Sequence, residues 1–154
     1  MTGSQLPRGD ILIARVEHDS GDFCQALTKL LPQLSNTAAP LTPTAFAAIV
    51  AAPDTYLYIA RTNTGAVVGM LTLVMYRIPT GLRARIEDVI VDQDYRGLGI
   101  AEALTTTALH QAGHSGARTV DLTSSPSRES ARLLYERLGF TARDTTTYRH
   151  SPNH

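Results

Sequence analysis

The residues best suited to chemistry form a short turn, Arg96-Gly97-Leu98-Gly99-Ile100-Ala101, which follows an apolar run and precedes an amphipathic one. We expect this turn to open a helix, whose first backbone N–H groups have no intrahelical partner and lie at the positive end of its dipole. Gly97 and Gly99 carry no Cβ, so an anion can approach those N–H groups closely. Arg96 adds a positive charge beside them. The turn therefore predicts a phosphate or pyrophosphate site.

Two common nucleotide sites do not fit this pattern. A dinucleotide-binding fingerprint needs a third glycine, and Glu102 stands where that glycine would be. The P-loop needs Gly-Lys-Ser or Gly-Lys-Thr, and the sequence contains neither.

The turn matches the Arg/Gln-x-x-Gly-x-Gly/Ala signature of the GCN5-related N-acetyltransferase (GNAT) superfamily. A second segment, Ala131–Phe140, resembles the family's second motif, a helix ending in Leu-Gly-Phe. The two motifs stand in the family's order and about the expected distance apart. The resemblance is specific for Ile86–Phe140 and rests on element order alone before that.

The resemblance implies direct transfer of an acetyl group from acetyl-CoA to a primary amine of a small molecule or a protein, with no metal. The turn would hold the pyrophosphate of acetyl-CoA. The pantetheine arm would pair like a short strand with Val89-Ile90-Val91, where this strand splays from Thr119–Thr123. A backbone N–H near Val89 or Ile90 would bind the thioester carbonyl. Homodimers are frequent among similar proteins, and the resemblance leaves this state open.

Two side chains are candidates for proton transfer. Tyr135 matches the motif tyrosine that lies near the thioester sulfur in many family members, which implies a general acid for the departing thiolate; the alternative is a tyrosine packed between helix and sheet. Glu87 is the candidate general base, acting directly or through water. Its alternatives are an ion pair with Arg85, or solvent as the base. Asp88 faces the other side of a regular strand, although a bulge would alter this.

One position departs from the family. Many members have an asparagine three residues before Ala131, where this sequence has Arg128. Ser127 is a candidate to replace that contact to the cofactor arm, as are Ser124 and Ser125. Ser127 also suits an ordinary helix N-cap.

The acceptor stays open. Ile86-Glu87-Asp88 resembles a stretch of the glucosamine-6-phosphate N-acetyltransferases, and Arg77, Arg83 and Arg85 lie nearby, so an amino-sugar phosphate is one alternative. A protein amine is a second. A module that binds acyl-CoA without catalysis is a third.

Hydrophobic periodicity and turn residues predict the elements that position these residues. Strands are expected at Ile11–Val16, Thr55–Arg61, Ala66–Tyr76, Ala84–Val91, Thr119–Thr123 and once or twice within Phe140–Arg149. Helices are expected from Asp19 or Ser20 to Leu34, at Pro43–Ala52 with Thr42 as cap, at Gly97–Ala112 and at Ser127–Leu138. The fold class is α/β (α+β): a GNAT-like mixed sheet of about six to seven strands flanked by about four helices.

Bulk properties are those of one ordinary globular domain of 154 residues, with residues 1–10 and 151–154 expected to be flexible. Fourteen basic and fourteen acidic side chains cancel, so no broad face for nucleic acid is indicated. The sequence lacks a signal peptide or membrane-spanning run, and Cys24 has no partner for an internal disulfide, so a cytoplasmic protein is expected. Cys24 is expected to be buried on a helix. His110 and His114 have metal-compatible spacing but better suit a helix C-terminus.

Overall fold

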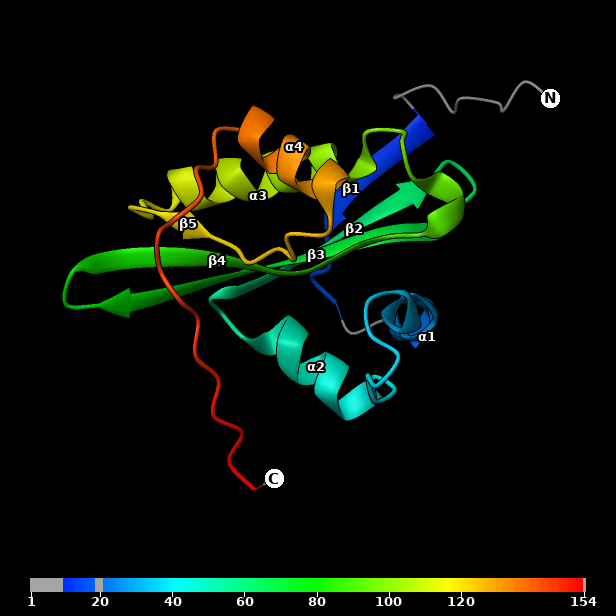
Figure 1. Ribbon diagram of the computed structural model, residues 1–154. Coiled ribbons are helices and arrows are strands. Elements are labelled where there is room, and N and C mark those ends of the chain that lie inside the picture. Colours follow the sequence, from blue (N-terminus) through cyan, green and yellow to red (C-terminus); the bar gives the residue numbers. More distant parts are fainter. Residues whose placement is uncertain (1–9, 19–20, 154) are drawn as a thin grey trace. The chain divides into compact units, whose positions relative to one another are not determined.

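The computed structural model describes residues 10–18 and 21–153 (Figure 1). The chain divides after Thr123 into two compact units. The predicted caps Asp19 and Ser20, and the ends 1–9 and 154, lie outside the described residues.

The first unit contains one five-stranded sheet with the strand order β1-β2-β3-β4-β5. Its strands are β1 (Ile11–Arg15), β2 (Thr55–Thr62), β3 (Val67–Ile78), β4 (Gly81–Val91) and β5 (Val120–Asp121). The first four strands pair antiparallel, and β5 runs parallel to β4. The mixed α/β class is confirmed, with five strands among the described residues instead of six to seven.

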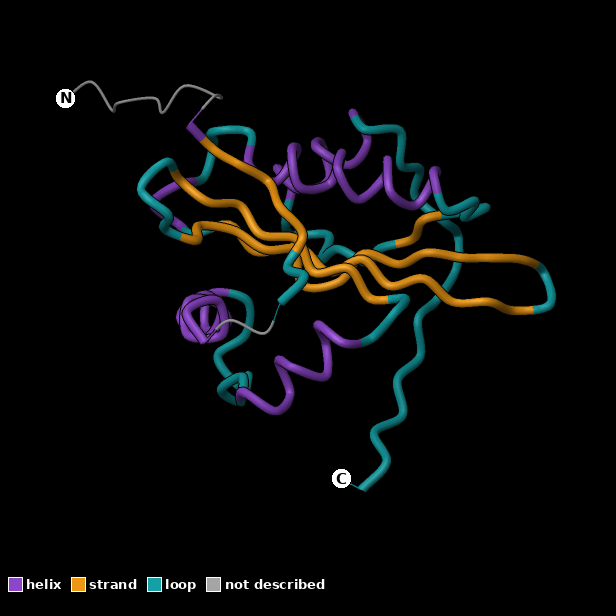
Figure 2. The backbone as a smooth tube through the Cα atoms, turned by 180° about the vertical axis from the view of Figure 1, so that it is seen from behind, coloured by secondary structure: helices purple, strands orange, loops and turns teal. Residues whose placement is uncertain are grey.

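Three helices cover the sheet. Helix α1 (Gly21–Leu30) passes into a 3-10 turn, η2 (Leu31–Gln33), because Pro32 has no N–H to continue the α-helix. Helix α2 (Pro43–Ala51) begins as predicted, with the Thr42 hydroxyl accepting from Ala45 N–H at 3.1 Å. Helix α3 spans Ile100–His114. Figures 1 and 2 show α1 and α2 on one face of the sheet and α3 on the other.

The core beneath α1 and α2 is apolar and includes the predicted buried cysteine, Cys24. Phe46 is its largest fully buried side chain, so we expect Phe46→Ala to cost about 3–5 kcal/mol. The cluster comprises Val16, Cys24, Leu27, Leu30, Phe46, Leu57, Ile59, Met70 and Ile90.

Helix α3 lies close to the sheet because β3 has a glycine beneath its first turn. A Cβ at Gly69 would lie 3.2 Å from Ile100 Cγ2 and 3.3 Å from Leu104 Cδ1. Both of these side chains are buried. Gly69 therefore sets the distance between β3 and the N-terminus of α3.

The second unit contains one helix, α4 (Glu129–Arg137). It ends as predicted at a left-handed glycine, Gly139, whose φ is 95°. The predicted start is wrong, because the N-cap position belongs to Arg128 and the Ser127 hydroxyl instead lies 2.9 Å from the Ser125 hydroxyl.

The final strands predicted within Phe140–Arg149 do not form, since no described residue after Arg137 belongs to a helix or strand. Threonines favour extended backbone, but a strand also needs a partner and an apolar side to bury, and nearly all of these side chains are exposed.

No helix in the described part of the chain is long and apolar enough to cross a membrane.

Candidate active site

The predicted anion-binding turn joins β4 to α3. After β4, the Asp92 carboxylate accepts from Asp94 N–H at 3.0 Å and holds a short 3-10 turn, η3 (Gln93–Tyr95). Arg96 then donates from Nε to the Val91 carbonyl at 3.2 Å. This bond fixes the stem of Arg96 against the end of the strand, while the residue as a whole remains exposed.

Two glycines in left-handed conformations bring the chain into the helix. Gly97 has φ of 78° and Gly99, at the N-cap position, has φ of 81°. Side-chain-bearing residues rarely adopt this region, so both glycines are required by the backbone itself. The predicted helix start at Gly97 is therefore wrong by three residues.

The geometry leaves the first N–H groups of α3 free to bind an anion. The first backbone hydrogen bond at the start of α3 runs from Ala103 N–H to the Gly99 carbonyl at 3.0 Å. The N–H groups before it, at Ile100 and Ala101, lie in the first turn of α3 and have no intrahelical acceptor. We call the segment Arg96–Ala101 the cradle.

Strand β4 has a free edge next to the cradle. Its parallel pairing with β5 consists of Ala84 with Val120 and Arg85 with Asp121. No described strand pairs with residues 86–91 on that side of β4. The β4 edge around Val89-Ile90-Val91 therefore has no described strand partner on this side, as the predicted splay requires.

A β-bulge interrupts β4 at Asp88. Thr72 pairs with Glu87 whereas Met70 pairs with Ile90, so Leu71 faces two residues of β4. Asp88 has φ of 52°, a conformation that aspartate tolerates better than most residues. The bulge withdraws backbone groups at Asp88 and Val89 from the regular ladder.

The bulge also decides which side chains share a face. Glu87 lies opposite Thr72, two residues from Met70, and therefore faces the α1/α2 side of the sheet. Ile90 lies opposite Met70 and faces the same side. A regular strand would have placed Glu87 and Ile90 on opposite faces.

Glu87 lies beside Arg85, whose Nε donates to Glu87 Oε1. Both side chains are partly exposed. The ion pair considered from the sequence is thus present, and it occupies one of the two carboxylate oxygens.

Asp88, which the sequence places on the face opposite Glu87 unless the strand bulges, lies at the bulge itself. Partial burial raises the pKa of its carboxyl, and the negative charge of Glu87 raises it further. The only signal in the sequence is a second acid inside an apolar strand, Ile86-Glu87-Asp88-Val89-Ile90-Val91.

Tyr135 and Ser127 belong to the second unit and are described within it. The Tyr135 ring packs edge-on against Phe140, with centroids 5.7 Å apart. Burial raises the pKa of the Tyr135 hydroxyl above its ordinary value of 10.0, and the positive charge of Arg128 opposes this. The phenol is therefore protonated at neutral pH.

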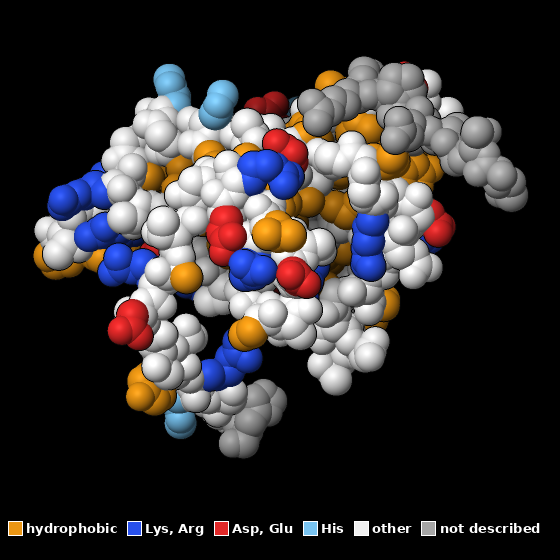
Figure 3. Space-filling model, turned by 45° about the horizontal axis from the view of Figure 1, so that its top comes forward, with side chains coloured by type: hydrophobic (Ala, Val, Ile, Leu, Met, Phe, Trp, Pro, Cys, Tyr) orange, Lys and Arg blue, Asp and Glu red, His pale blue; other side chains and the backbone are white. Residues whose placement is uncertain are grey.

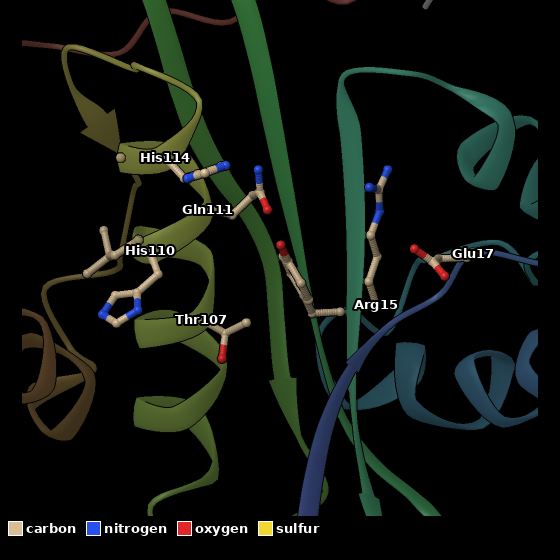
Figure 4. A pocket seen from close by; sticks show the side chains of 9 residues that line it. Arg15, Glu17, Thr107, His110, Gln111 and His114 are labelled. Carbon is tan, nitrogen blue, oxygen red and sulfur yellow. The ribbon is translucent and has the colours of Figure 1, made fainter.

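A separate groove of about 850 Å³ lies in the first unit. Figure 4 shows Arg15 and Glu17 on one side and Thr107, His110, Gln111 and His114 of α3 on the other. His110 is ten residues after Ile100, about 15 Å along the helix, so this groove is distinct from the cradle. None of the described residues form a cluster of three or more potential metal ligands that includes these histidines.

The chain is similar in sequence to known acetyltransferases. Residues 23–140 match the model of the acetyltransferase (GNAT) family. Glucosamine 6-phosphate N-acetyltransferase from Trypanosoma brucei brucei is 38% identical over 84 residues, which cover 53% of this chain and 55% of that protein. N-alpha-acetyltransferase 30 from Schizosaccharomyces pombe is 39% identical over 61 residues, 40% of this chain and 41% of that protein. The matches thus span about half the length of these curated relatives.

Solved structures share the fold over nearly the whole chain. The crystal structure of a Trypanosoma brucei acetyltransferase superposes with a TM-score of 0.77 at 26% identity, covering 92% of this chain and 100% of that one. With the family match extending from α1 to the end of the second motif, the chain belongs to the GNAT family of acetyltransferases.

Proposed function

We propose that this chain transfers an acetyl group from acetyl-CoA directly to a primary amine. The observation that carries the proposal is the continuity of a free β4 edge, a bulge and the cradle within one run of 16 residues, 86–101. A thioester-bearing extended arm that ends in a pyrophosphate has the chemistry to occupy all three features together.

The cradle would fix the donor by its phosphates. The unpaired N–H groups at the start of α3 and the positive end of its dipole favour an anion there. The exposed Arg96 guanidinium adds charge next to those groups. Ser127 is proposed as a second contact to the cofactor arm, in place of the asparagine usual in the family.

The bulge would provide the donor for the developing oxyanion. As the amine attacks the thioester carbon, a C–N bond forms and negative charge gathers on the carbonyl oxygen. A backbone N–H released from the ladder near Val89 or Ile90 can stabilise that charge without reorganising. This role needs no side chain at either position.

The amine must also lose a proton. Glu87 keeps Oε2 outside its ion pair with Arg85, so this oxygen can accept the proton directly or through water. Asp88 is the second carboxylate candidate, because its raised pKa makes it the stronger base once ionised.

The leaving thiolate must gain a proton when the C–S bond breaks. Tyr135 is proposed as its donor. A phenol whose pKa is raised is a weaker acid than a thiol of pKa about 8.5. The proton transfer is therefore proposed to be concerted with C–S cleavage, as the electron pair of that bond moves onto the sulfur and makes it basic.

An amino-sugar phosphate is the second candidate for the acceptor. It is favoured by the 38% identity to the trypanosomal glucosamine 6-phosphate N-acetyltransferase together with Ile86-Glu87-Asp88. The phosphate of such a substrate would have to bind within one sugar ring of the amine. Arg85 is proposed as its partner, because it is the arginine that lies next to Glu87.

The test is an acetylation panel with mass-spectrometric identification of products. The protein is incubated with acetyl-CoA and with amino-sugar phosphates, polyamines, aminoglycosides or peptides that have free N-termini. Formation of an N-acetyl product supports the proposal. Binding of acetyl-CoA without transfer to any class would instead indicate a non-catalytic acyl-CoA-binding module.

A further inference from the structure

The far end of the β3–β4 hairpin is strongly basic. Residues 76–85 and the adjoining loop 117–119 contain four arginines and no acidic residue, although the whole chain has fourteen of each charge. We call these two segments the arm. Figure 3 shows basic side chains gathered at this end of the first unit. The arginines of the arm are Arg77, Arg83, Arg85 and Arg118.

Two of these guanidinium groups are anchored on a single residue at the tip. Arg118 Nη1 donates to the Thr80 carbonyl at 2.8 Å, and Arg83 Nη2 donates to the Thr80 hydroxyl at 3.1 Å. Arg83 Nη1 also donates to the Thr119 hydroxyl at 3.2 Å. All three acceptors are neutral, so they orient the two cations without cancelling their charge.

The backbone makes room for this arrangement. Gly81 has φ of 122°, and a Cβ at this residue would lie 2.6 Å from Arg118 Cδ. The Arg118 stem therefore occupies the place of the missing side chain. The position of the guanidinium is set by packing and by hydrogen bonding together, unlike that of a free surface arginine.

The charges on the arm are unequally neutralised. Arg85 is paired with Glu87, but no carboxylate of the described residues lies within ion-pair distance of Arg77, Arg83 or Arg118. Holding two like charges on one threonine costs free energy unless an anion compensates them. Each planar guanidinium still has several N–H donors for carboxylate oxygens.

The arm shares a face with the proposed base. Arg83 lies opposite Tyr76, and alternation places Arg83 on the same side of β4 as Glu87. Tyr76 and Ile78 are 39% and 44% exposed, so this face carries apolar side chains between the arginines. From Glu87 to Gly81 the strand advances six residues, about 20 Å at 3.3 Å per residue.

We propose that the acceptor is a polypeptide, held by an acidic segment that binds Arg83 and Arg118 about six residues from the amine to be acetylated. The inference rests on the proposed acetyl transfer and names its substrate class. An amino-sugar phosphate is too short to reach both Glu87 and the tip. An extended peptide spans this distance and can place apolar side chains on Tyr76 and Ile78.

The test compares three synthetic peptides that share one free N-terminal amine. The first has four glutamates at positions 6–9, the second has glutamines there, and the third has its glutamates at positions 2–5. We expect kcat/KM for the first peptide to exceed that for the second about fivefold at low ionic strength, and to exceed that for the third. Added NaCl should reduce the preference.

Arg83→Gln/Arg118→Gln should abolish the preference. The matched control Arg143→Gln/Arg149→Gln removes the same charge from exposed positions of the second unit and should preserve it. Circular dichroism and turnover of a small amine report whether the arm variant remains folded and active. Equal rates on all three peptides, or equal loss in both double variants, would overturn the proposal.

A binding measurement separates failure of the arm from failure of the proposed function. Fluorescence anisotropy of the first peptide, labelled at its C-terminus, needs no turnover. Tight binding that depends on Arg83 and Arg118, without acetylation by acetyl-CoA, would support the arm and contradict the activity. Acetylation of amines with no preference for glutamates would support the activity and contradict the arm.

Discussion

The two ends of β4 carry different kinds of recognition. At the Val91 end the available groups are backbone N–H groups, exposed by two left-handed glycines and by the first turn of α3. At the Gly81 end the available groups are guanidinium groups held in place by Thr80. Backbone recognition suits a donor that never changes, whereas side-chain recognition can be altered one residue at a time to suit an acceptor.

The largest effect should come from closing the donor end. Gly99→Val places a β-branched residue at φ of 81° and adds bulk where the anion would approach. We expect acetyl-CoA affinity to fall about 100-fold or more, measured by calorimetry. Gly116→Val is the control, since Gly116 has φ of 86°, lies beyond the other end of α3 and has open space around it. Unchanged acetyl-CoA affinity in Gly99→Val would contradict the proposal that the cradle binds the donor.

The next effect should arise in the second unit, from the proposed acid. Tyr135→Phe keeps the ring packed against Phe140 but removes the proton, so kcat should fall about 100-fold with little change in acetyl-CoA affinity. Because the pKa of Tyr135 is raised, wild-type activity should show no loss of this acid below pH 10. Tyr148→Phe is the control, at a tyrosine that is 90% exposed. Parallel losses in rate and affinity would indicate a binding role instead.

A smaller effect is expected at the bulge, which lies between the two ends of β4. Glu87→Gln should lower kcat about tenfold at pH 7, because Asp88 and water remain as alternative bases. The rise of kcat with pH should weaken. If Asp88 is the base, Asp88→Asn should abolish that rise instead. In that case kcat would rise at a higher pH than for an ordinary aspartate, because a carboxyl with a raised pKa stays protonated to higher pH. A pH profile unchanged in both variants would leave solvent as the base.

The smallest effect tests whether the acceptor end also depends on backbone geometry. Gly81→Ala keeps every arginine but drives a Cβ into Arg118 Cδ, so the preference for the acidic peptide should fall about threefold. Gly65→Ala is matched to it, because Gly65 ends the β2–β3 turn with φ of 89° and has no neighbour within 4 Å. If both variants lose the preference equally, general strain and not Arg118 is responsible.

The backbone geometry of the cradle was predictable because it needs particular residue types. Glycine at 97 and 99 is required by positive φ, and the Thr42 cap and the Gly139 stop follow from equally local rules. The bulge at Asp88 was not predictable in this way. It depends on how β3 pairs with β4, and alternation within β4 alone would place Ile90 on the face opposite Glu87, whereas the bulge puts both on one face.

The last residues also show that pairing with distant strands is not predictable from local sequence, here for strands that were predicted but do not form. Thr145, Thr146 and Thr147 favour extended backbone, yet the segment forms no strand, because pairing partners are supplied by distant sequence. The arm was predictable only in part. Its arginines were visible in the sequence, but the shared anchor of Arg83 and Arg118 on Thr80 depends on a contact between residues 38 positions apart.

Gly69 links the proposed donor site to the packing of the core. It lies on β3 and not in the cradle, yet a methyl group at this position would press on Ile100, Leu104 and the Ile90 carbonyl at 3.2–3.3 Å. Relief of that pressure would shift the first turn of α3 by a few tenths of an ångström relative to β4. Natural variation at Gly69 could therefore separate relatives by donor affinity while every residue of the cradle stays the same.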